Sequence, residues 1–159
     1  MGKPTIMKHE EYMNIAIDEA RLAAQQGEVP VGAVLVLDGE VVAQAHNQRE
    51  TTHDATAHAE VLAIRQACAK LQNWRLTGAD LYVTLEPCPM CAGAIVNARI
   101  GRVIYGAPDS KAGGVDSLFN IVNNKNLDHR VEILSGICET ECREVLQEFL
   151  KTKRGGENA

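Results

Sequence analysis

Hydrophobic residues recur every three or four positions between residues 9 and 26, with acidic residues between them. Met13, Ile17, Ala20 and Ala24 fall on one face at this spacing, which predicts an amphipathic helix. Gly27 is the natural end of that helix, because glycine readily adopts the left-handed conformation that often follows a helical C-terminus.

The pattern then changes to two nearly continuous apolar segments, residues 31–37 and 41–45. Asp38 and Gly39 lie between them, and this pair is typical of a tight hairpin in which both turn residues have positive φ. The first segment is apolar at almost every position, which favours a central strand covered on both faces.

A polar stretch over residues 46–56 predicts a loop, and Thr56 is a candidate N-cap for a second helix. That helix runs to about residue 72, with His58 and Glu60 in its first turn. The residues expected on its buried face are Val61, Ile64, Cys68 and Leu71.

The rest of the chain predicts further strands and helices in alternation. Residues 81–85 predict a strand that Pro87 ends, and Pro89 is well placed as the first residue of a helix. A strand at 102–105, a long polar loop at 106–126 with one helical turn around 117–121, and a strand at 130–134 follow. The apolar residues of a closing helix are Cys142, Val145, Leu146 and Phe149, and residues 155–159 are expected to form a frayed tail.

This order predicts an α/β fold, a three-layer αβα sandwich with a mixed sheet of about five strands and helices on both faces. A chain of 159 residues is long enough to bury its own core, so we expect one domain over residues 1–159 with its core at about 8–154.

Composition narrows the class of protein. With 45% hydrophobic and 23% charged residues, the chain is neither disordered nor fibrous, and no apolar run approaches a membrane span. No secretory signal segment is visible, so we expect no membrane partner and a cytoplasmic location. The net charge of -5 argues against a general nucleic-acid coat but leaves room for a local basic face. Five cysteines, an odd number, fit free thiols in a reducing compartment.

Cys88 and Cys91 lie three residues apart at a predicted helix start, so both thiols can share one face of its first turn. Free amides and the helix dipole lower thiol pKa values there, which favours the thiolates that zinc requires. His58, at another helix start, brings the set to three ligands. A closed tetrahedral site needs four, so the pattern indicates a catalytic zinc with water in the open position.

Glu60, two residues after His58, is placed to approach that water without binding the metal. Zinc lowers the pKa of bound water toward about 7, which gives a nucleophile at neutral pH. Attack on an aromatic ring carbon that bears an amine also requires proton delivery to a ring nitrogen and to the departing ammonia. We therefore expect Glu60 to be the proton shuttle.

Other interpretations of the cysteines and histidines remain open. Cys88 and Cys91 could be a redox pair or core residues, or could hold a structural zinc with a fourth ligand that the sequence does not supply. Cys138 and Cys142 have i, i+4 spacing, but core packing explains them better than a second metal. Surface or loop positions are the default expectation for the remaining histidines, His9, His46, His53 and His129.

The combination of His58-Ala59-Glu60 with Pro87-Cys88-Pro89-Met90-Cys91 matches the signature of zinc-dependent nucleobase deaminases. Within the cytidine and deoxycytidylate deaminase superfamily, the chain resembles the bacterial tRNA adenosine deaminase family over roughly residues 8–154. Further segments that carry this resemblance are residues 28–34, 53–60, 81–88, 90–94 and 99–103.

The resemblance implies a cytidine-deaminase-like fold, a homodimer, and hydrolytic deamination of the wobble adenosine of a tRNA anticodon to inosine. It implies that His58, Cys88 and Cys91 bind one Zn²⁺ per chain and that Glu60 shuttles protons. The partner would be the tRNA anticodon stem-loop, with no DNA expected. Implied substrate contacts are Asn47, which holds the target nucleotide, Val29 and Pro30 in a loop against the base, Ala59, and Asp109 in a loop that contacts the RNA.

Two other functions would use the same zinc ligands. A deaminase of a free base or nucleoside, of guanine or cytosine type, would need the same zinc and glutamate, and the acidic net charge favours it slightly. A zinc-stabilised RNA-binding module without catalysis would have no use for Glu60. The match outside the metal residues favours the tRNA enzyme.

Overall fold

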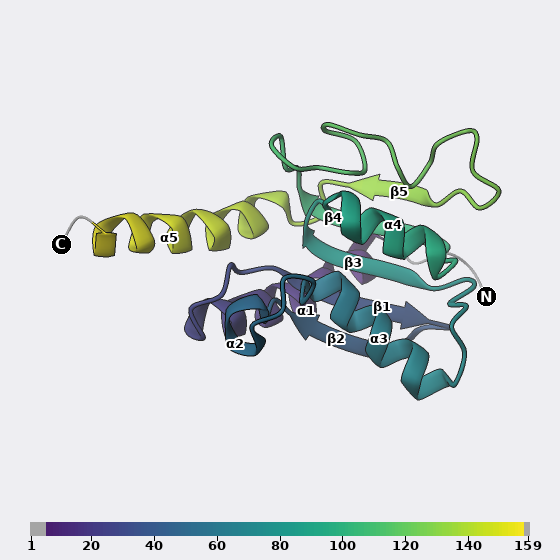
Figure 1. The fold of residues 1–159 in the computed structure, drawn as a ribbon, viewed down its shortest axis with the longest axis horizontal. Helices are drawn as coiled ribbons and strands as arrows, with labels where there is room; N and C mark the ends of the chain where they lie inside the picture. Colours follow the sequence, from purple (N-terminus) through teal and green to yellow (C-terminus); the bar gives the residue numbers. More distant parts are fainter. Residues whose placement is uncertain (1–5, 158–159) are drawn as a thin grey trace.

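The computed structural model describes residues 6–157, with side chains through residue 153. A five-stranded mixed sheet forms its centre, in the order β2-β1-β3-β4-β5 (Figure 1). The first three strands in that order pair antiparallel and the last three pair parallel. The strands are β1 (Gly32–Leu37), β2 (Glu40–His46), β3 (Asp80–Leu85), β4 (Arg102–Ala107) and β5 (Glu132–Ser135).

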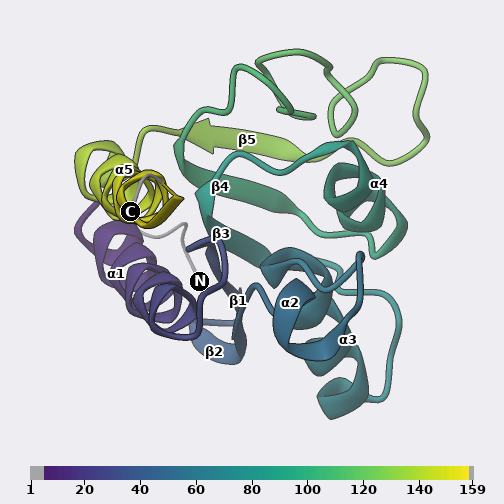
Figure 2. The same cartoon turned by 60° about the vertical axis from the view of Figure 1, so that its left-hand side comes forward.

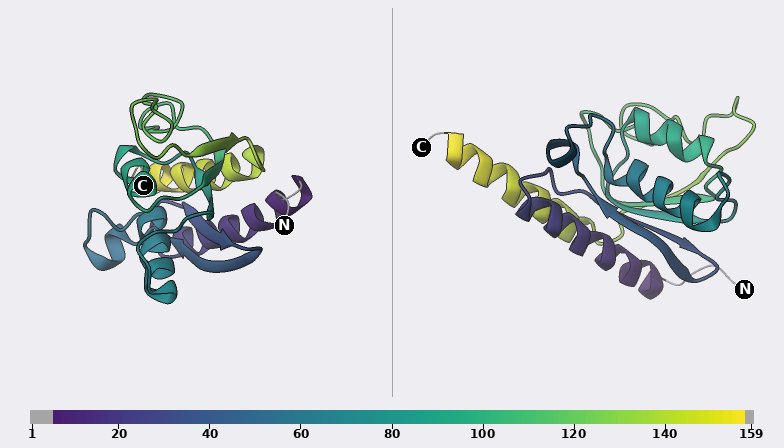
Figure 3. Two further views of the ribbon diagram at one scale, coloured as in Figure 1. Left: turned by 90° about the vertical axis from the view of Figure 1, so that its right-hand side faces the viewer. Right: turned by 60° about the horizontal axis from the view of Figure 1, so that its bottom comes forward.

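Helices cover both faces of the sheet, which confirms the predicted three-layer arrangement. Helices α1 (Ile6–Gln25) and α5 (Glu139–Glu157) run side by side on one face (Figures 2 and 3). Helices α3 (Ala59–Leu71) and α4 (Pro89–Asn97) cover the other face, and the short helix α2 (Arg49–Thr52) lies in the connection between β2 and α3.

The first hairpin agrees with its sequence signal. Asp38 and Gly39 have φ values of 52° and 78°, as a turn with two left-handed residues requires. Strand β1 lies between β2 and β3 and is buried at every position except Leu37, so its central placement is confirmed. At Gly32 a Cβ atom would overlap the carbonyl oxygen of Ala16, so glycine allows α1 to pack closely on this strand.

Two expectations about the segment before α3 are wrong. Residues 49–52 form helix α2 inside the stretch predicted to be loop. Thr56 does not cap α3, because its hydroxyl donates to Asp54 and the N-cap residue is His58, which makes no side-chain capping bond.

The buried face of α3 also differs from the prediction. Small residues and one carboxyl group occupy it, namely Ala59, Glu60, Ala63 and Ala67. The larger residues predicted there flank the contact or are exposed, because alanines let the helix axis approach the sheet more closely than branched side chains would.

The second half of the chain holds fewer elements than expected. Residues 108–131 contain no helix, including the predicted turn at 117–121. Helix α5 continues to Glu157, beyond the residue at which the tail was predicted to begin, and residues 158–159 lie outside the described range. None of the helices within residues 6–157 is long and apolar enough to cross a membrane.

Two of the four remaining histidines are buried, which contradicts their expected surface or loop positions. His9 is 4% exposed and its Nδ1 atom lies 2.7 Å from the hydroxyl of Tyr82. His46 is 8% exposed and contacts Glu19. A single sequence gives little sign of such burial, since histidine is common both inside and outside proteins.

Candidate active site

The starts of α3 and α4 meet at one edge of the sheet. His58 is the N-cap residue of α3 and Cys88 is the N-cap residue of α4, and both have extended backbone conformations. Pro89 occupies the first turn of α4, where its missing N–H costs no helical hydrogen bond. The Nδ1 atom of His58 lies 3.7 Å from the Sγ atom of Cys88 and 3.5 Å from that of Cys91.

These three donor atoms fit a tetrahedral metal ion. Zinc bond lengths of about 2.3 Å to sulfur and 2.0–2.1 Å to nitrogen imply edges of about 3.6 Å between nitrogen and sulfur. The observed separations of 3.5 and 3.7 Å agree with that edge. Among the described residues, His58, Cys88 and Cys91 form the one group of histidine, cysteine and acidic side chains close enough to hold a metal. A fourth protein ligand, which a structural zinc would need, is absent from this group.

The protonation of the group also suits a cation. Hydrogen bonds from Cys91 and His58 lower the pKa of Cys88 to about 4, although burial opposes this. The bond to Cys88 raises the pKa of His58, and the bond to Cys88 together with burial raises that of Cys91. Cys88 is thus the thiol that loses its proton first, and a divalent cation bound here would displace protons from the other ligands.

Glu60 points from the first turn of α3 into the same region. Its side chain is buried, and burial raises its pKa to about 7, with the Cys88 thiolate adding to the rise and His58 opposing it. A carboxyl group that ionises near neutral pH can both accept and return a proton there.

A cavity of about 160 Å³ opens beside these residues. It is smaller than the roughly 300–1,000 Å³ of pockets for drug-sized ligands, which suits a single ring system. Six of its lining residues were predicted to be site residues: Val29, Asn47, His58, Glu60, Cys88 and Asp109. Five were not: Val31, Arg49, Leu85, Glu86 and Ala112. Arg49 was missed because its segment was predicted to be a loop without a partner.

Three predicted residues lie beside the cavity without lining it. Cys91, Pro30 and Ala59 are buried, and the backbone N–H of Ala59 donates to Oδ1 of Asn47 over 2.8 Å. Nδ2 of Asn47 donates to the carbonyl oxygen of Val29 over 3.0 Å. Asn47 therefore ties the loop that carries Val29 to the helix start that carries His58 and Glu60.

Glu86 organises the opposite side of the cavity. Its carboxylate accepts hydrogen bonds from the backbone of the 109–117 segment: from the N–H groups of Asp109, Val115, Asp116 and Ser117. The Ser117 hydroxyl also donates to it. Burial alone would raise the pKa of Glu86, but these donors outweigh it and lower the pKa. The loop that places Asp109 at the cavity is thus fixed to the residue just before Pro87 and Cys88.

Known proteins are similar to this chain in sequence and in fold. A family model described as MafB19-like deaminase matches residues 7–154. The tRNA-specific adenosine deaminase of Bacillus subtilis is 51% identical over 145 residues, which cover 91% of this chain and 90% of that protein. The protein of the same name from Agrobacterium fabrum is 50% identical over 143 residues, which cover 90% and 94%.

Solved structures give the same grouping. A structure from studies of A-to-I editing by tRNA:A34 deaminases at the wobble position superposes with a TM-score of 0.83 and 50% identity, over 86% of this chain and 99% of that one. The guanine deaminase of Bacillus subtilis reaches a TM-score of 0.60 and 44% identity over 63% and 64% of the two chains. By its sequence and its fold, this chain belongs to the MafB19-like deaminase family and, within it, to the tRNA-specific adenosine deaminases.

Proposed function

We propose that this protein hydrolyses the wobble adenosine of a tRNA anticodon to inosine and releases ammonia. One observation supports this above the others. A chain about 50% identical to tRNA:A34 deaminases over most of its length brings His58, Cys88 and Cys91 together beside a buried Glu60 in a cavity of about 160 Å³. The cavity suits one nucleobase, and RNA loops present unstacked bases that can enter such pockets.

His58, Cys88 and Cys91 would hold one zinc ion. When bound, zinc acts as a Lewis acid that makes water a nucleophile near neutral pH. In the reaction a C–O bond forms at the purine carbon that carries the amine, and the C–N bond to that amine breaks. Glu60 would accept a proton from the attacking water and give it to the neighbouring ring nitrogen. It would then carry the second proton, from the newly added hydroxyl group, to the amine, which leaves as ammonia.

The remaining cavity residues would hold the nucleotide. Asn47 retains hydrogen-bonding capacity beyond its bonds to Val29 and Ala59, since an amide offers two donor hydrogens and two acceptor lone pairs. Val29 and Pro30 would pack against the base, and Asp109 would contact the RNA. Arg49 lines the cavity and is exposed, which suits a phosphate of the target nucleotide.

The decisive experiment compares substrates. The purified protein is incubated with a transcribed tRNA that carries adenosine at the wobble position, with the same tRNA carrying guanosine there, and with free adenosine, guanine and cytidine. We expect inosine in the digested RNA, and ammonia, from the first substrate alone. Deamination of free guanine or cytidine without reaction of the tRNA would refute the proposal in favour of a free-base deaminase.

The free-base alternative has weaker support. The guanine deaminase of Bacillus subtilis matches less of this chain, at a lower TM-score, than the tRNA:A34 deaminase structure does. A non-catalytic RNA-binding module is disfavoured as well, because Glu60 is buried beside an incomplete metal ligand set, where a structural site gains nothing from a carboxyl group.

We further propose that the protein is a homodimer. Leu118 and Phe119 are adjacent, apolar, and 51% and 54% exposed in the loop before β5, where a second copy would cover them. Light scattering of wild type and a Leu118→Asp variant tests the dimer, and a wild-type monomer would refute it.

The five free cysteines and a tRNA substrate also agree with a cytoplasmic location.

A further inference from the structure

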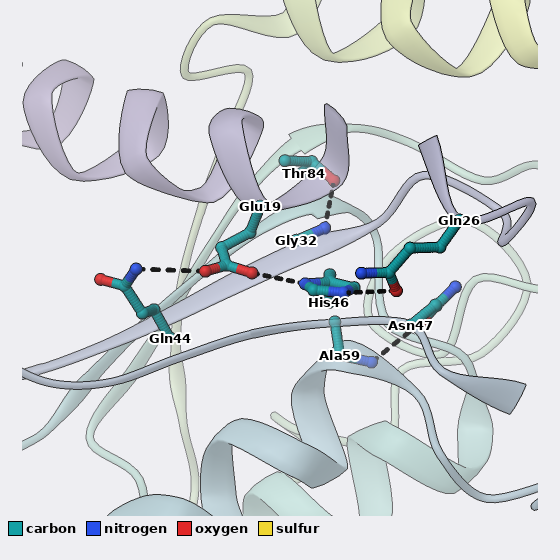
Figure 4. Close-up of polar contacts among 8 residues, drawn as sticks. All are labelled: Glu19, Gln26, Gly32, Gln44, His46, Asn47, Ala59 and Thr84. Atoms are coloured by element: carbon teal, nitrogen blue, oxygen red, sulfur yellow. Dashed lines mark hydrogen bonds and ion pairs between the residues drawn. The ribbon is translucent and has the colours of Figure 1, made fainter. Parts of the chain in front are cut away.

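A polar cluster with two buried members, Glu19 and His46, lies between α1 and the end of β2, on the face of the sheet away from α3 (Figure 4). Its other two members, Gln26 and Gln44, are exposed. Nδ1 of His46 donates to Oε2 of Glu19 over 2.5 Å, and Nε2 of Gln44 donates to the other carboxylate oxygen over 3.1 Å. Glu19 and His46 are each 8% exposed. None of these side chains takes part in the proposed reaction.

The second ring nitrogen of His46 is also engaged. Its Nε2 atom lies 3.1 Å from Oε1 of Gln26, so both ring nitrogens meet an acceptor oxygen. The Glu19 carboxylate and the Gln26 side chain therefore hold the imidazole ring from two sides. Ring rotation would break at least one of these bonds, so the cluster fixes the orientation of His46.

His46 is followed directly by Asn47. Consecutive residues at a strand end point to opposite faces of the sheet, so His46 faces α1 while Asn47 faces α3 (Figure 4). The backbone N–H of Asn47 donates to the carbonyl oxygen of Val31, and its side chain bridges Val29 and Ala59.

Gln26 connects the same cluster to a second segment beside the cavity. It stands at the end of α1, three residues before Val29, which lines the cavity. His46 is therefore joined, through Asn47 and through Gln26, to the two segments that carry cavity residues on this side. A buried polar pair whose hydrogen bonds are all made restricts its side chains to one geometry.

We propose that the Glu19–His46 pair is a positioning element that holds Asn47 in the geometry required to bind the target nucleotide. The expected change in KM rests on the proposed function. The expected effect on the position of Asn47 does not. Glu19 and His46 contact no substrate and act through Asn47.

The chain offers a matched control in a second buried pair. His9 also belongs to α1, is 4% exposed, and contacts the buried hydroxyl of Tyr82. Neither His9 nor Tyr82 lines the cavity. Replacing His9 therefore removes a comparable buried contact between α1 and the sheet without disturbing the segments around Asn47.

The kinetic test uses Glu19→Gln and His46→Gln, which keep approximate side-chain size, with His9→Gln as the control. For a wobble-adenosine anticodon stem-loop we expect KM to rise about tenfold in the first two variants while kcat stays within about twofold. The double variant should resemble either single one, because each change breaks the same pair. An unchanged KM, or an equal rise in His9→Gln, would overturn the proposal.

A second measurement does not depend on activity. The Ala59 amide donates to Asn47, so its hydrogen exchange reports whether Asn47 is held in place. We expect that amide to exchange about tenfold faster in Glu19→Gln than in wild type, relative to the Leu81 amide in the central sheet. Unchanged exchange would overturn the positioning role, even if KM rose. Absence of wild-type deamination with accelerated exchange would instead reject the proposed function and keep the positioning role.

Discussion

The Nδ1 atom of His58 lies 3.5 Å from the Sγ atom of Cys91, although 33 residues separate them in the chain. Helix α3, the loop after it and strand β3 carry the chain from one helix start to the other. The proposed metal-ligand set therefore depends on how α3 and α4 dock on the sheet, and it forms only once both helices are in place.

Removal of one ligand should abolish metal binding. In Cys88→Ala two protein ligands remain, which is fewer than known zinc sites use, so we expect zinc affinity to fall by at least about 100-fold. Zinc content measured by mass spectrometry should drop from about one ion per chain to near zero, with loss of deamination.

The matched control for that variant is Cys68→Ala. Cys68 is a half-buried residue on α3 that lies outside the ligand group. The Cys68→Ala variant should keep its zinc and its activity. Full zinc content in Cys88→Ala would contradict the assignment of the ligands, and activity retained after complete metal removal would contradict the mechanism.

Loss of the Glu60 carboxyl group should separate metal binding from turnover. Glu60→Gln keeps the size of the side chain but cannot accept a proton, so we expect kcat to fall about 10²–10⁴-fold while zinc content is unchanged. Single-turnover assays with the anticodon stem-loop, together with zinc analysis of the same sample, test this. Near-normal turnover in the zinc-loaded variant would rule out Glu60 as the proton shuttle.

The sequence pointed to His58, Cys88 and Cys91 as one group, and the structure brings these three side chains together. Cys88 and Cys91 are three residues apart at a helix start, so one turn of helix places them on the same face. His58 and Glu60 are two residues apart at another helix start. Hydrophobic periodicity likewise predicted the sheet and its covering helices, since alternation and helical period directly reflect burial.

What the sequence did not reveal are buried polar contacts between distant segments. Glu28, Glu86 and His46 are all buried, although acidic residues and histidines are predicted at the surface by default. Their partners lie more than 20 residues away for the most part, as with Glu28 and Thr51, and no periodicity links them. The same limit hid helix α2, whose four residues lack an apolar face and are held by Glu28.

Glu86 should contribute more to the free energy of unfolding than an ordinary surface carboxylate does. In Glu86→Gln the amide oxygen can replace one acceptor oxygen, but the other position becomes a donor that faces backbone N–H groups of the 109–117 segment. We expect a loss of about 2–4 kcal/mol in the free energy of unfolding, measured in urea.

The control for Glu86→Gln is Glu144→Gln, at an exposed position of α5, where we expect a change within about 0.5 kcal/mol. Hydrogen exchange should also accelerate at residues 115–117 in the first variant. Equal stabilities of the two variants would mean that Glu86 does not organise the loop.

Glu28 should make stability depend on pH. Burial opposes ionisation of its carboxyl group, but bonds from the Thr51 hydroxyl and from the backbone N–H groups of Thr51 and Glu50 outweigh it and lower its pKa below 4.5. The unfolded chain therefore binds this proton more readily than the folded one. The stabilisation is present above the unfolded pKa and is lost as pH falls through the folded pKa.

The variant Glu28→Gln removes that ionisation. At pH 7 we expect it to be less stable than wild type by about 1–3 kcal/mol, because charge-assisted hydrogen bonds at the start of α2 are lost. The difference should shrink as pH falls below 4.5, since a protonated Glu28 resembles glutamine. Urea unfolding at several pH values measures it, with Glu50→Gln, an exposed neighbour, as the control. If the difference in the free energy of unfolding stayed constant as the pH fell below 4.5, packing of Glu28, and not its carboxylate charge, would be what stabilises the fold.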